Sequence, residues 1–263
     1  MIIVKIGGGE KLNLDGIVED LAALTEPFII IHGANALRDQ IAKKMGFDKK
    51  VITSASGYTS VFSDNDALDA ILMAYSGLRN KRLVEMFQQK GVNAVGLTGL
   101  DGRIVQGQRN KGIRVVENGK KMIKRDLSGK PKSVNAALLT LLLDNQYTPV
   151  LTIPIADENG FAINTENDDV ICTLQESLCA HTVIQLIEAP GFLNDATDES
   201  SLVAKMPREE LADREQQVDG RMKRKMHALV KLARSEVQRI IISDGRTDNP
   251  VRDALNGSGT WIE

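Results

Sequence analysis

The chain opens with Ile2-Ile3-Val4-Lys5-Ile6-Gly7-Gly8-Gly9, the stretch that decides the fold class. Its first five residues are mostly β-branched, and a continuous apolar run of this kind is typical of a parallel strand buried on both faces. The glycines that follow favour a tight turn at the end of the strand. An amphipathic pattern over residues 14–24 then indicates a helix. The opening therefore predicts a strand–turn–helix unit.

The same order of elements recurs along the chain. Phe28-Ile29-Ile30-Ile31 follows Pro27 as a second buried strand, and His32-Gly33-Ala34-Asn35 leads from it into a helix over residues 37–45. Further helices are expected over residues 64–90, capped by Ser63 or Asp64, and over 134–144, 168–179 and 220–235, with strands over 92–97, 147–153, 182–187 and 239–243. This alternation predicts a three-layer αβα sandwich with a mainly parallel sheet.

Length and composition narrow the class of protein. A chain of 263 residues is near the upper limit for one core, so we expect two packed lobes with a boundary near Ala180. The 33 basic and 35 acidic side chains nearly balance, which excludes a global attraction to nucleic acid. Because the sequence lacks an apolar stretch of roughly 18 residues and a signal-peptide pattern, we expect no membrane association and a cytosolic location.

Two cysteines, Cys172 and Cys179, lie seven residues apart in a helical pattern. This spacing suits neither a zinc site nor a disulfide framework. Both are expected to be buried structural thiols.

Two glycine turns follow the first two strands, at residues 7–9 and at Gly33. Turns at the carboxyl ends of parallel strands expose backbone N–H groups at helix N-termini, where phosphate can bind. Neither turn matches the P-loop pattern G-x-x-x-x-G-K-S/T or the dinucleotide pattern G-x-G-x-x-G. Lys5 lies inside the first apolar strand, where an ammonium group is costly unless it emerges toward an anion. These features indicate a phosphate site of another type.

Several motifs in order along the chain resemble the amino acid kinase family. Val4-Lys5-Ile6-Gly7-Gly8 resembles its opening, and His32-Gly33 resembles the start of its second glycine turn. The later motifs span residues 93–102, 164–168, 189–193 and 220–225. Within the family, the chain resembles the branch of N-acetylglutamate kinase and its relative that acts on aminoadipate or glutamate attached to a small acidic amino-group carrier protein. Residues 80–84 and 220–225 favour the carrier-dependent relative.

The resemblance implies a carbamate kinase-like fold and an ATP- and Mg²⁺-dependent phosphotransferase whose acceptor is a carboxyl group. It places Lys5 and Lys225 on either side of the transferring phosphoryl group, where two cations offset negative charge, and has Asp168 orient both lysines. Residues 1–180 would bind the acceptor and residues 181–263 the nucleotide. No protein cage for the metal is evident.

The resemblance also assigns binding residues to each substrate. The phosphate-binding residues are Gly7, Gly8, Gly33 and Ala34. The nucleotide-binding residues are Glu188, Pro190, Gly191, Phe192, Leu193, Gly220 and Met222. The acceptor-binding residues are Gly57, Val61 and Asn164. A homodimer formed through the long helix of the first lobe is usual in this branch.

The chain departs from the family pattern at the acceptor. A G-x-x-S-R-like segment usually supplies an arginine that pairs with the acceptor's α-carboxylate, but here Gly57-Tyr58-Thr59-Ser60 is followed by Val61. Ala34-Asn35 also replaces further glycines in the second turn, and Glu188 stands where Asp or Asn is usual. Two alternatives stay open: a kinase acting on free N-acetylglutamate, which Val61 disfavours, and a non-catalytic amino-acid or nucleotide sensor, which Val61 and Ala34 favour.

Short alternating patterns typical of hairpins lie between residues 103 and 132. Within them, residues 109–132 form a basic segment that contains two acidic residues, Glu117 and Asp126, and nine basic ones: Arg109, Lys111, Arg114, Lys120, Lys121, Lys124, Arg125, Lys130 and Lys132. Such a patch is either a docking surface for an acidic carrier protein or a solvated hairpin face.

Overall fold

The computed structural model describes residues 1–48, 50–54, 59–117, 120–218 and 220–263. A mixed sheet of eleven strands runs through this part of the chain. At its centre, β1 (Ile2–Ile6) pairs in parallel with β2 (Phe28–His32) and with β12 (Thr182–Ile187). The parallel array continues through β10 (Thr148–Ala156) and β5 (Ala94–Gly99) on one side and β14 (Arg239–Asp244) on the other.

Shorter strands complete the edges of this sheet. Strand β15 (Thr260–Ile262) is antiparallel to β14 and pairs with β13 (Lys205–Met206). At the opposite edge, β6 (Val105–Arg109) and β9 (Gly129–Val134) form an antiparallel pair, and β11 (Ala162–Ile163) pairs with β10. The mainly parallel sheet predicted from the sequence is confirmed.

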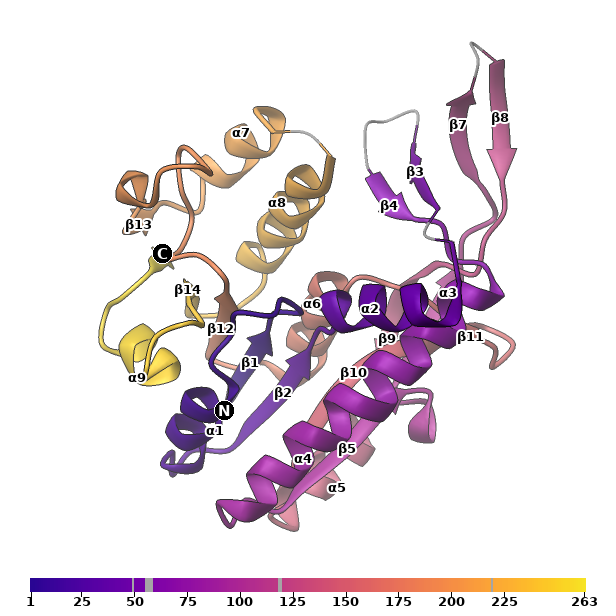
Figure 1. Cartoon of the computed structure of the whole chain (residues 1–263). Coiled ribbons are helices and arrows are strands. Elements are labelled where there is room, and N and C mark those ends of the chain that lie inside the picture. The colour runs from indigo at the N-terminus through magenta and orange to yellow at the C-terminus, as the bar shows by residue number, and fades with distance from the viewer. Residues whose placement is uncertain (49, 55–58, 118–119, 219) are drawn as a thin grey trace.

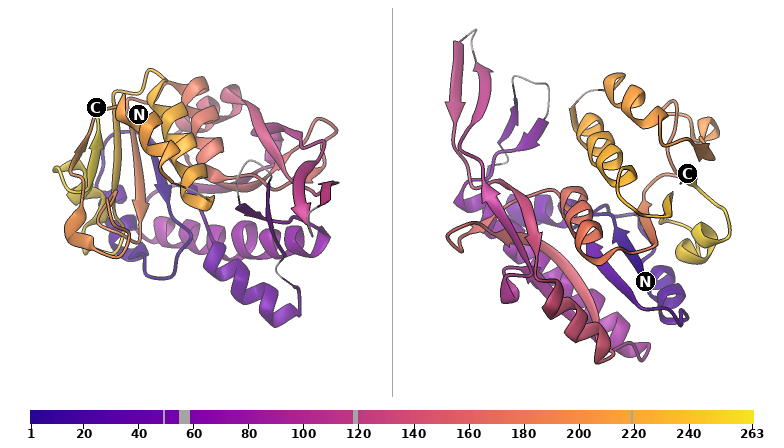
Figure 2. Two further views of the ribbon diagram at one scale, coloured as in Figure 1. Left: turned by 90° about the horizontal axis from the view of Figure 1, so that it is seen from above. Right: turned by 180° about the vertical axis from the view of Figure 1, so that it is seen from behind.

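Helices cover both faces of the sheet (Figures 1 and 2). One face packs on α1 (Leu14–Ala22), α4 (Asn80–Gln89) and α9 (Pro250–Leu255). The other packs on α5 (Ala136–Asp144), α6 (Asn167–Leu178), α7 (Glu210–Gln216) and α8 (Gly220–Ala233). The helix α3 (Asn65–Ile71) and the π-helix η1 (Leu72–Arg79) lead directly into α4. Helix α2 (Asn35–Met45) follows β2, and short 3-10 turns lie at Asp101–Arg103 and Glu199–Ser201.

Strand β1 shows how its sequence serves both faces. Ile3 lies in the core on one face, while Ile2, Val4 and Ile6 lie in the core on the other. Because successive side chains of a strand point to opposite faces, an unbroken apolar run is what a strand covered on both sides requires. The predicted three-layer sandwich is confirmed.

The long predicted helix is also present, with a local irregularity. Asp64 is its N-cap, since the carboxylate accepts a hydrogen bond from the Ala67 N–H at 3.0 Å. The helix then runs continuously through α3, η1 and α4 to Gln89.

The prediction for the cysteines is half wrong. Cys172 is buried, and burial raises the pKa of its thiol to about 12. Cys179 is exposed. It is the left-handed C-cap of α6, with φ of 51°, and its side chain lies outside the apolar face of the helix.

Two hairpins rise from the body beside each other (Figures 1 and 2). The first pairs β3 (Val51–Thr53) with β4 (Thr59–Val61), and the second pairs β7 (Ile113–Glu117) with β8 (Lys120–Lys124). A bridge between Ser54 and Val115 joins them. The predicted hairpin within residues 103–132 is therefore present, whereas the lobe boundary near Ala180 stays a prediction. Within the described residues, no helix has both the length and the apolar character needed to span a membrane.

Candidate active site

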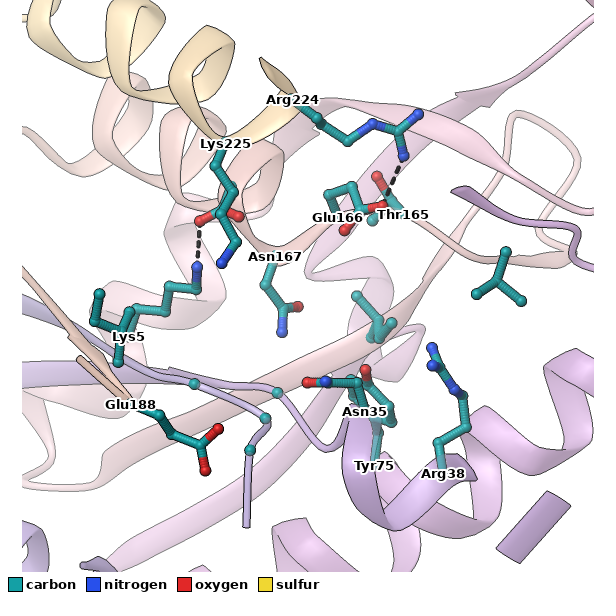
Figure 3. A pocket seen from close by; sticks show the side chains of 18 of the residues that line it. Lys5, Asn35, Arg38, Tyr75, Thr165, Glu166, Asn167, Glu188, Arg224 and Lys225 are labelled. Carbon is teal, nitrogen blue, oxygen red and sulfur yellow. Dashed lines mark hydrogen bonds and ion pairs between the residues drawn. The ribbon is translucent and has the colours of Figure 1, made fainter. Parts of the chain in front are cut away.

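A cavity of about 360 Å³ lies beyond the carboxyl ends of β1, β2 and β12 (Figure 3). Its floor is formed by the two glycine turns and α2, and its walls by the N-terminal ends of α6 and α8. This volume is within the range of small-molecule sites, and the crevice at the carboxyl ends of parallel strands is where α/β proteins bind ligands. Ten predicted site residues line it: Lys5, Gly7, Gly8, Gly33, Val61, Asn164, Asp168, Glu188, Met222 and Lys225.

Lys5 and Asp168 form an ion pair at the centre of the cavity. Lys5 comes from β1 and is 8% exposed, and Asp168 lies in the first turn of α6. A carboxylate at this position is also favoured by the helix dipole. Lys225 extends from α8 toward the same point (Figure 3). The fold thus brings together three charged groups that are far apart in the sequence, with the glycine turns beside them.

The two glycine turns pack against each other too closely for side chains. A Cβ on Gly8 would lie 2.6 Å from the backbone nitrogen of Asn35, and one on Gly33 would lie 2.9 Å from that of Gly8. The N–H groups of Gly7 and Gly33 donate to the carbonyls of Leu186 and Ile6, at 3.0 and 2.9 Å. Among the described residues, no acceptor pairs with the N–H groups of Gly8 and Gly9. These two donors are therefore available to a phosphate.

His32 is a structural residue beneath the second turn. It is fully buried, and burial lowers the pKa of its imidazole to about 3. Its Nε2 lies 3.0 Å from Nδ2 of Asn80. Its carbonyl accepts hydrogen bonds from Thr152 Oγ1 at 2.9 Å and from Asn167 Nδ2 at 2.8 Å. The carbonyl thus ties the end of β2 to β10 and to the start of α6, while the imidazole contacts the start of α4.

The far end of the cavity is held by a buried carboxylate. Asn164 donates from Nδ2 to Ser63 Oγ at 2.9 Å, and the Ser63 N–H donates to Asp126 Oδ2 at 3.1 Å. Asp126 is 5% exposed and also accepts from Ser128 Oγ at 2.6 Å. This network connects Asn164 to the base of the β7–β8 hairpin, which lies within the basic segment and is called the basic hairpin below. A smaller cavity of about 90 Å³ adjoins the first here and shares Val61, Asn164, Thr165, Glu166 and Arg224 with it.

The sequence did not single out several polar residues of the cavity. Arg224 donates to Glu166 Oε1 at 2.7 Å. Arg38 and Tyr75 approach the cavity from α2 and η1 (Figure 3). Thr165 Oγ1 and Asn167 Oδ1 are buried, and none of the described residues forms a hydrogen bond with them. Arg38 carries a weak sequence signal, since a cation just after a glycine turn opposes the helix dipole.

Comparisons with known proteins agree with this geometry. Residues 1–244 match the amino acid kinase family. The chain belongs to the amino acid kinase family. Over its whole length it is 40% identical to the LysW-aminoadipate kinase of Thermus thermophilus, of which it covers 100%. It is 39% identical to the LysW-aminoadipate kinase of Deinococcus radiodurans, in a match that covers 100% of this chain and 91% of that protein. The fold is similar to that of the solved structure of Giardia carbamate kinase, with a TM-score of 0.68 and 14% sequence identity. The superposition covers 99% of this chain and 97% of the Giardia chain.

The fold and the family resemblance predicted from the sequence are thereby confirmed. The residue roles stay predictions. In this family member, Gly57 lies outside the described residues. Ala34 is buried at the N-cap of α2 and does not line the cavity. Four predicted nucleotide-binding residues lie outside the cavity lining, and so does Gly220 at the start of α8. The four are Pro190, Gly191, Phe192 and Leu193.

One of these four residues, Phe192, has contacts of its own away from the cavity. The ring of Phe192 lies under the Arg214 guanidinium, whose Cζ is 5.3 Å from the ring centroid. The Phe192 N–H donates to Thr260 Oγ1 at 2.8 Å. Glu188, in contrast, lines the cavity and accepts a hydrogen bond from the Lys11 N–H, so that its carboxylate packs against Gly9.

Proposed function

We propose that this protein is an ATP-dependent kinase that phosphorylates the side-chain carboxylate of aminoadipate or glutamate. The acceptor's amino group is attached to an amino-group carrier protein, as in lysine or arginine biosynthesis. The Lys5–Asp168 ion pair, with Lys225 beside it and two glycine turns beneath, carries this proposal. The LysW-aminoadipate kinases at 40% and 39% identity support the choice of acceptor.

The chemistry needs no general base. A carboxylate oxygen attacks the γ-phosphorus of ATP in line, the bond from that phosphorus to the ADP oxygen breaks, and an acyl phosphate and ADP form. Negative charge is spread over the transferring group in this step, and Lys5 and Lys225 stabilise it. Asp168 holds the Lys5 ammonium in place. The backbone donors of Gly8 and Gly9 orient the phosphates.

Mg²⁺ fits the site as a partner of the nucleotide. Within the described part of the chain, no group of three His, Cys, Asp or Glu side chains is placed to hold a metal. A magnesium ion commonly keeps several waters and binds through substrate phosphates, which suits a site of this kind. When bound, it neutralises charge on the phosphates. Glu188 and Asp168 are the carboxylates that line the cavity near the glycine turns.

The basic hairpin is the surface we propose for the carrier protein. Lys111, Arg114, Lys120 and Arg125 are exposed there, and the adjoining Ser63–Asp126–Asn164 network leads from its base to the cavity. Complementary charge speeds encounter and fixes register between partners. Replacing Arg114 and Lys120 together by glutamate should raise KM for the carrier-linked acceptor and leave KM for ATP unchanged. An unchanged acceptor KM would make the hairpin a solvated face.

The test of the activity is to trap its product. Purified protein is incubated with ATP, Mg²⁺ and hydroxylamine, which converts an acyl phosphate into a hydroxamate. N-acetylglutamate, aminoadipate, glutamate and the carrier-linked forms are offered separately. We expect hydroxamate from a carrier-linked acceptor only. Hydroxamate from free N-acetylglutamate would identify that kinase activity instead, and ligand-dependent thermal stabilisation without any ATP consumption would indicate a sensor.

A homodimer through the long helix is part of the proposal. Met73 and Leu78 on η1 are 37% and 45% exposed, so apolar surface is available there. Light scattering of the purified protein measures its mass directly, and a monomeric mass would refute the dimer. The cytosolic location stays a prediction.

A further inference from the structure

We infer that Arg38 binds the α-carboxylate of the acceptor and so selects for acceptors that carry one. The inference rests on the proposed function, because it takes the acceptor to be an N-linked amino acid with two carboxylates. One of these reacts beside Lys5 and Lys225. The other enters the same cavity and loses water there, which is costly unless a cation with free donors faces it.

Arg38 is placed to supply that cation. Its side chain rises from the first turns of α2 toward the open part of the cavity, next to Tyr75 (Figure 3). The side chain is 13% exposed. Tyr75 is 5% exposed and Ile153 is 4% exposed, and both line the cavity with Arg38. The guanidinium therefore has apolar and buried neighbours, where an ionic hydrogen bond is stronger than in water.

Arg38 also has donors to spare. Its Nε and Nη2 both donate to a single oxygen, Oδ1 of Asp39, at 2.9 and 2.6 Å. The two N–H bonds of Nη1 have no acceptor among the described residues. Asp39 is 39% exposed, so solvent screens its charge more than that of a buried partner. A carboxylate in the cavity can thus be bound without displacing Asp39.

Two of the other described cations of the cavity serve its phosphoryl end. Lys5 is paired with Asp168 there, and Lys225 extends toward the same end (Figure 3). Arg224 donates to Glu166 at 2.7 Å and is, with Arg38, a described cation left for a second carboxylate. The Arg38 side chain is 13% exposed and that of Arg224 26%, so a carboxylate is desolvated more fully beside Arg38.

The position of Arg38 in its helix supports an anionic partner. It is the fourth residue of α2, whose first turn contains no acidic side chain. The N-terminal end of a helix carries partial positive charge, so a cation there is unfavourable in the free protein. Binding of an anion relieves this repulsion. Val61, which stands where the family usually has an arginine, lines the same cavity, and its side chain has no hydrogen-bond donor. Arg38 on α2 would take the place of that arginine.

The experiment compares Arg38→Gln and Arg38→Lys with the parent protein. Arg82→Gln is the control, because Arg82 forms a surface pair with Glu85 and its side chain is 66% exposed. The acceptors are carrier-linked aminoadipate and the same conjugate with its α-carboxylate converted to a carboxamide. KM for each acceptor, KM for ATP and kcat are measured, and binding of the acid conjugate is measured by calorimetry.

Arg38→Gln should raise KM for the acid conjugate about 10- to 100-fold, the effect of losing hydrogen bonds to a charged group. It should leave KM for ATP within about twofold and should no longer distinguish acid from carboxamide. Arg38→Lys should lie between, since lysine keeps the charge but not the planar fork. Arg82→Gln should match the parent. Adding Val61→Arg to Arg38→Gln should recover most of the lost affinity, which a purely structural role of Arg38 would not allow.

Different outcomes separate this inference from the function on which it rests. A parent protein that neither binds nor phosphorylates the acid conjugate overturns both. If the parent is active and Arg38→Gln keeps its preference for the acid over the carboxamide, only the role of Arg38 is overturned. Loss of that preference in Arg224→Gln alone would assign the carboxylate to Arg224 instead. Thermal unfolding of each variant identifies one that fails to fold, and Arg38→Lys then serves as the test.

Discussion

Removal of the Lys5 ammonium should affect turnover and stability through separate causes. In Lys5→Met the transferring group would lose one of the two cations proposed to stabilise it, and the loss of one preorganised charge-stabilising group should lower kcat by about 10²- to 10³-fold. The variant also leaves Asp168 without its partner, and the two side chains are only 10% and 14% exposed. Breaking a buried ion pair on one side costs about 3–5 kcal/mol. The residual exposure places Lys5→Met near the lower end, at about 3 kcal/mol.

The double variant Lys5→Met/Asp168→Asn separates these two effects. The neutral pair removes the uncompensated charge, so the free energy of unfolding should return to within about 1 kcal/mol of the parent. The kcat should stay low, because the cation is still missing. Urea denaturation gives the free energies and coupled ADP release gives kcat at saturating substrates. A double variant with parental kcat would refute the catalytic role of Lys5, and one no more stable than Lys5→Met would refute the ion-pair argument.

Three further results are expected. Gly8→Ala should raise KM for ATP or abolish binding, because its Cβ would lie 2.6 Å from the backbone nitrogen of Asn35; titration with ATP measures this. Asp64→Asn should weaken the fall in the free energy of unfolding at acid pH. The hydrogen bond from Lys50 lowers the pKa of the Asp64 carboxyl, so its stabilisation is present above the ordinary value of 3.8 and is lost as pH falls below it. Urea denaturation between pH 3 and 6, about one unit below and two above that value, checks this. His32 should stay neutral down to about pH 4, since burial lowers its pKa to about 3, and imidazole nitrogen shifts in an NMR titration that moved near the ordinary value of 6.5 would contradict this.

Much of the fold follows from local pattern in the sequence. The residues of β1 and β2 alternate between two cores, so their unbroken apolar runs specify strands covered on both faces. Asp64 was predicted as a helix cap from its residue type and position, and its carboxylate accepts the expected hydrogen bond from the Ala67 N–H. Helices α7 and α9 were not predicted, because each is short, at 7 and 6 residues, and its stability comes from packing rather than from periodicity.

A site residue was predicted from the sequence where its side chain is unfavourable in its own strand or helix. Site residues were missed where only the tertiary structure brings them together. Lys5 in an apolar strand is costly without an anionic partner, so its role had a physical signal. In the sequence Arg224 is an ordinary helix residue, and Arg38 carries only the weak signal of a cation near a helix N-terminus. Only the folded chain brings them to one cavity from α2 and α8. Cys179 was misassigned because the pattern of α6 does not reveal that its last turn ends in a left-handed residue.

Transfer of the phosphoryl group to a carboxylate is tested most directly by the origin of an oxygen atom. Carrier-linked aminoadipate carrying ¹⁸O in its side-chain carboxylate is incubated with ATP and Mg²⁺, the product is cleaved with hydroxylamine, and the released phosphate is analysed by mass spectrometry. Attack by the carboxylate on the γ-phosphorus predicts phosphate that contains one ¹⁸O atom from the acceptor. Phosphate without ¹⁸O would mean that ATP was merely hydrolysed, and would contradict the assignment of this cavity as the site of acyl phosphate formation.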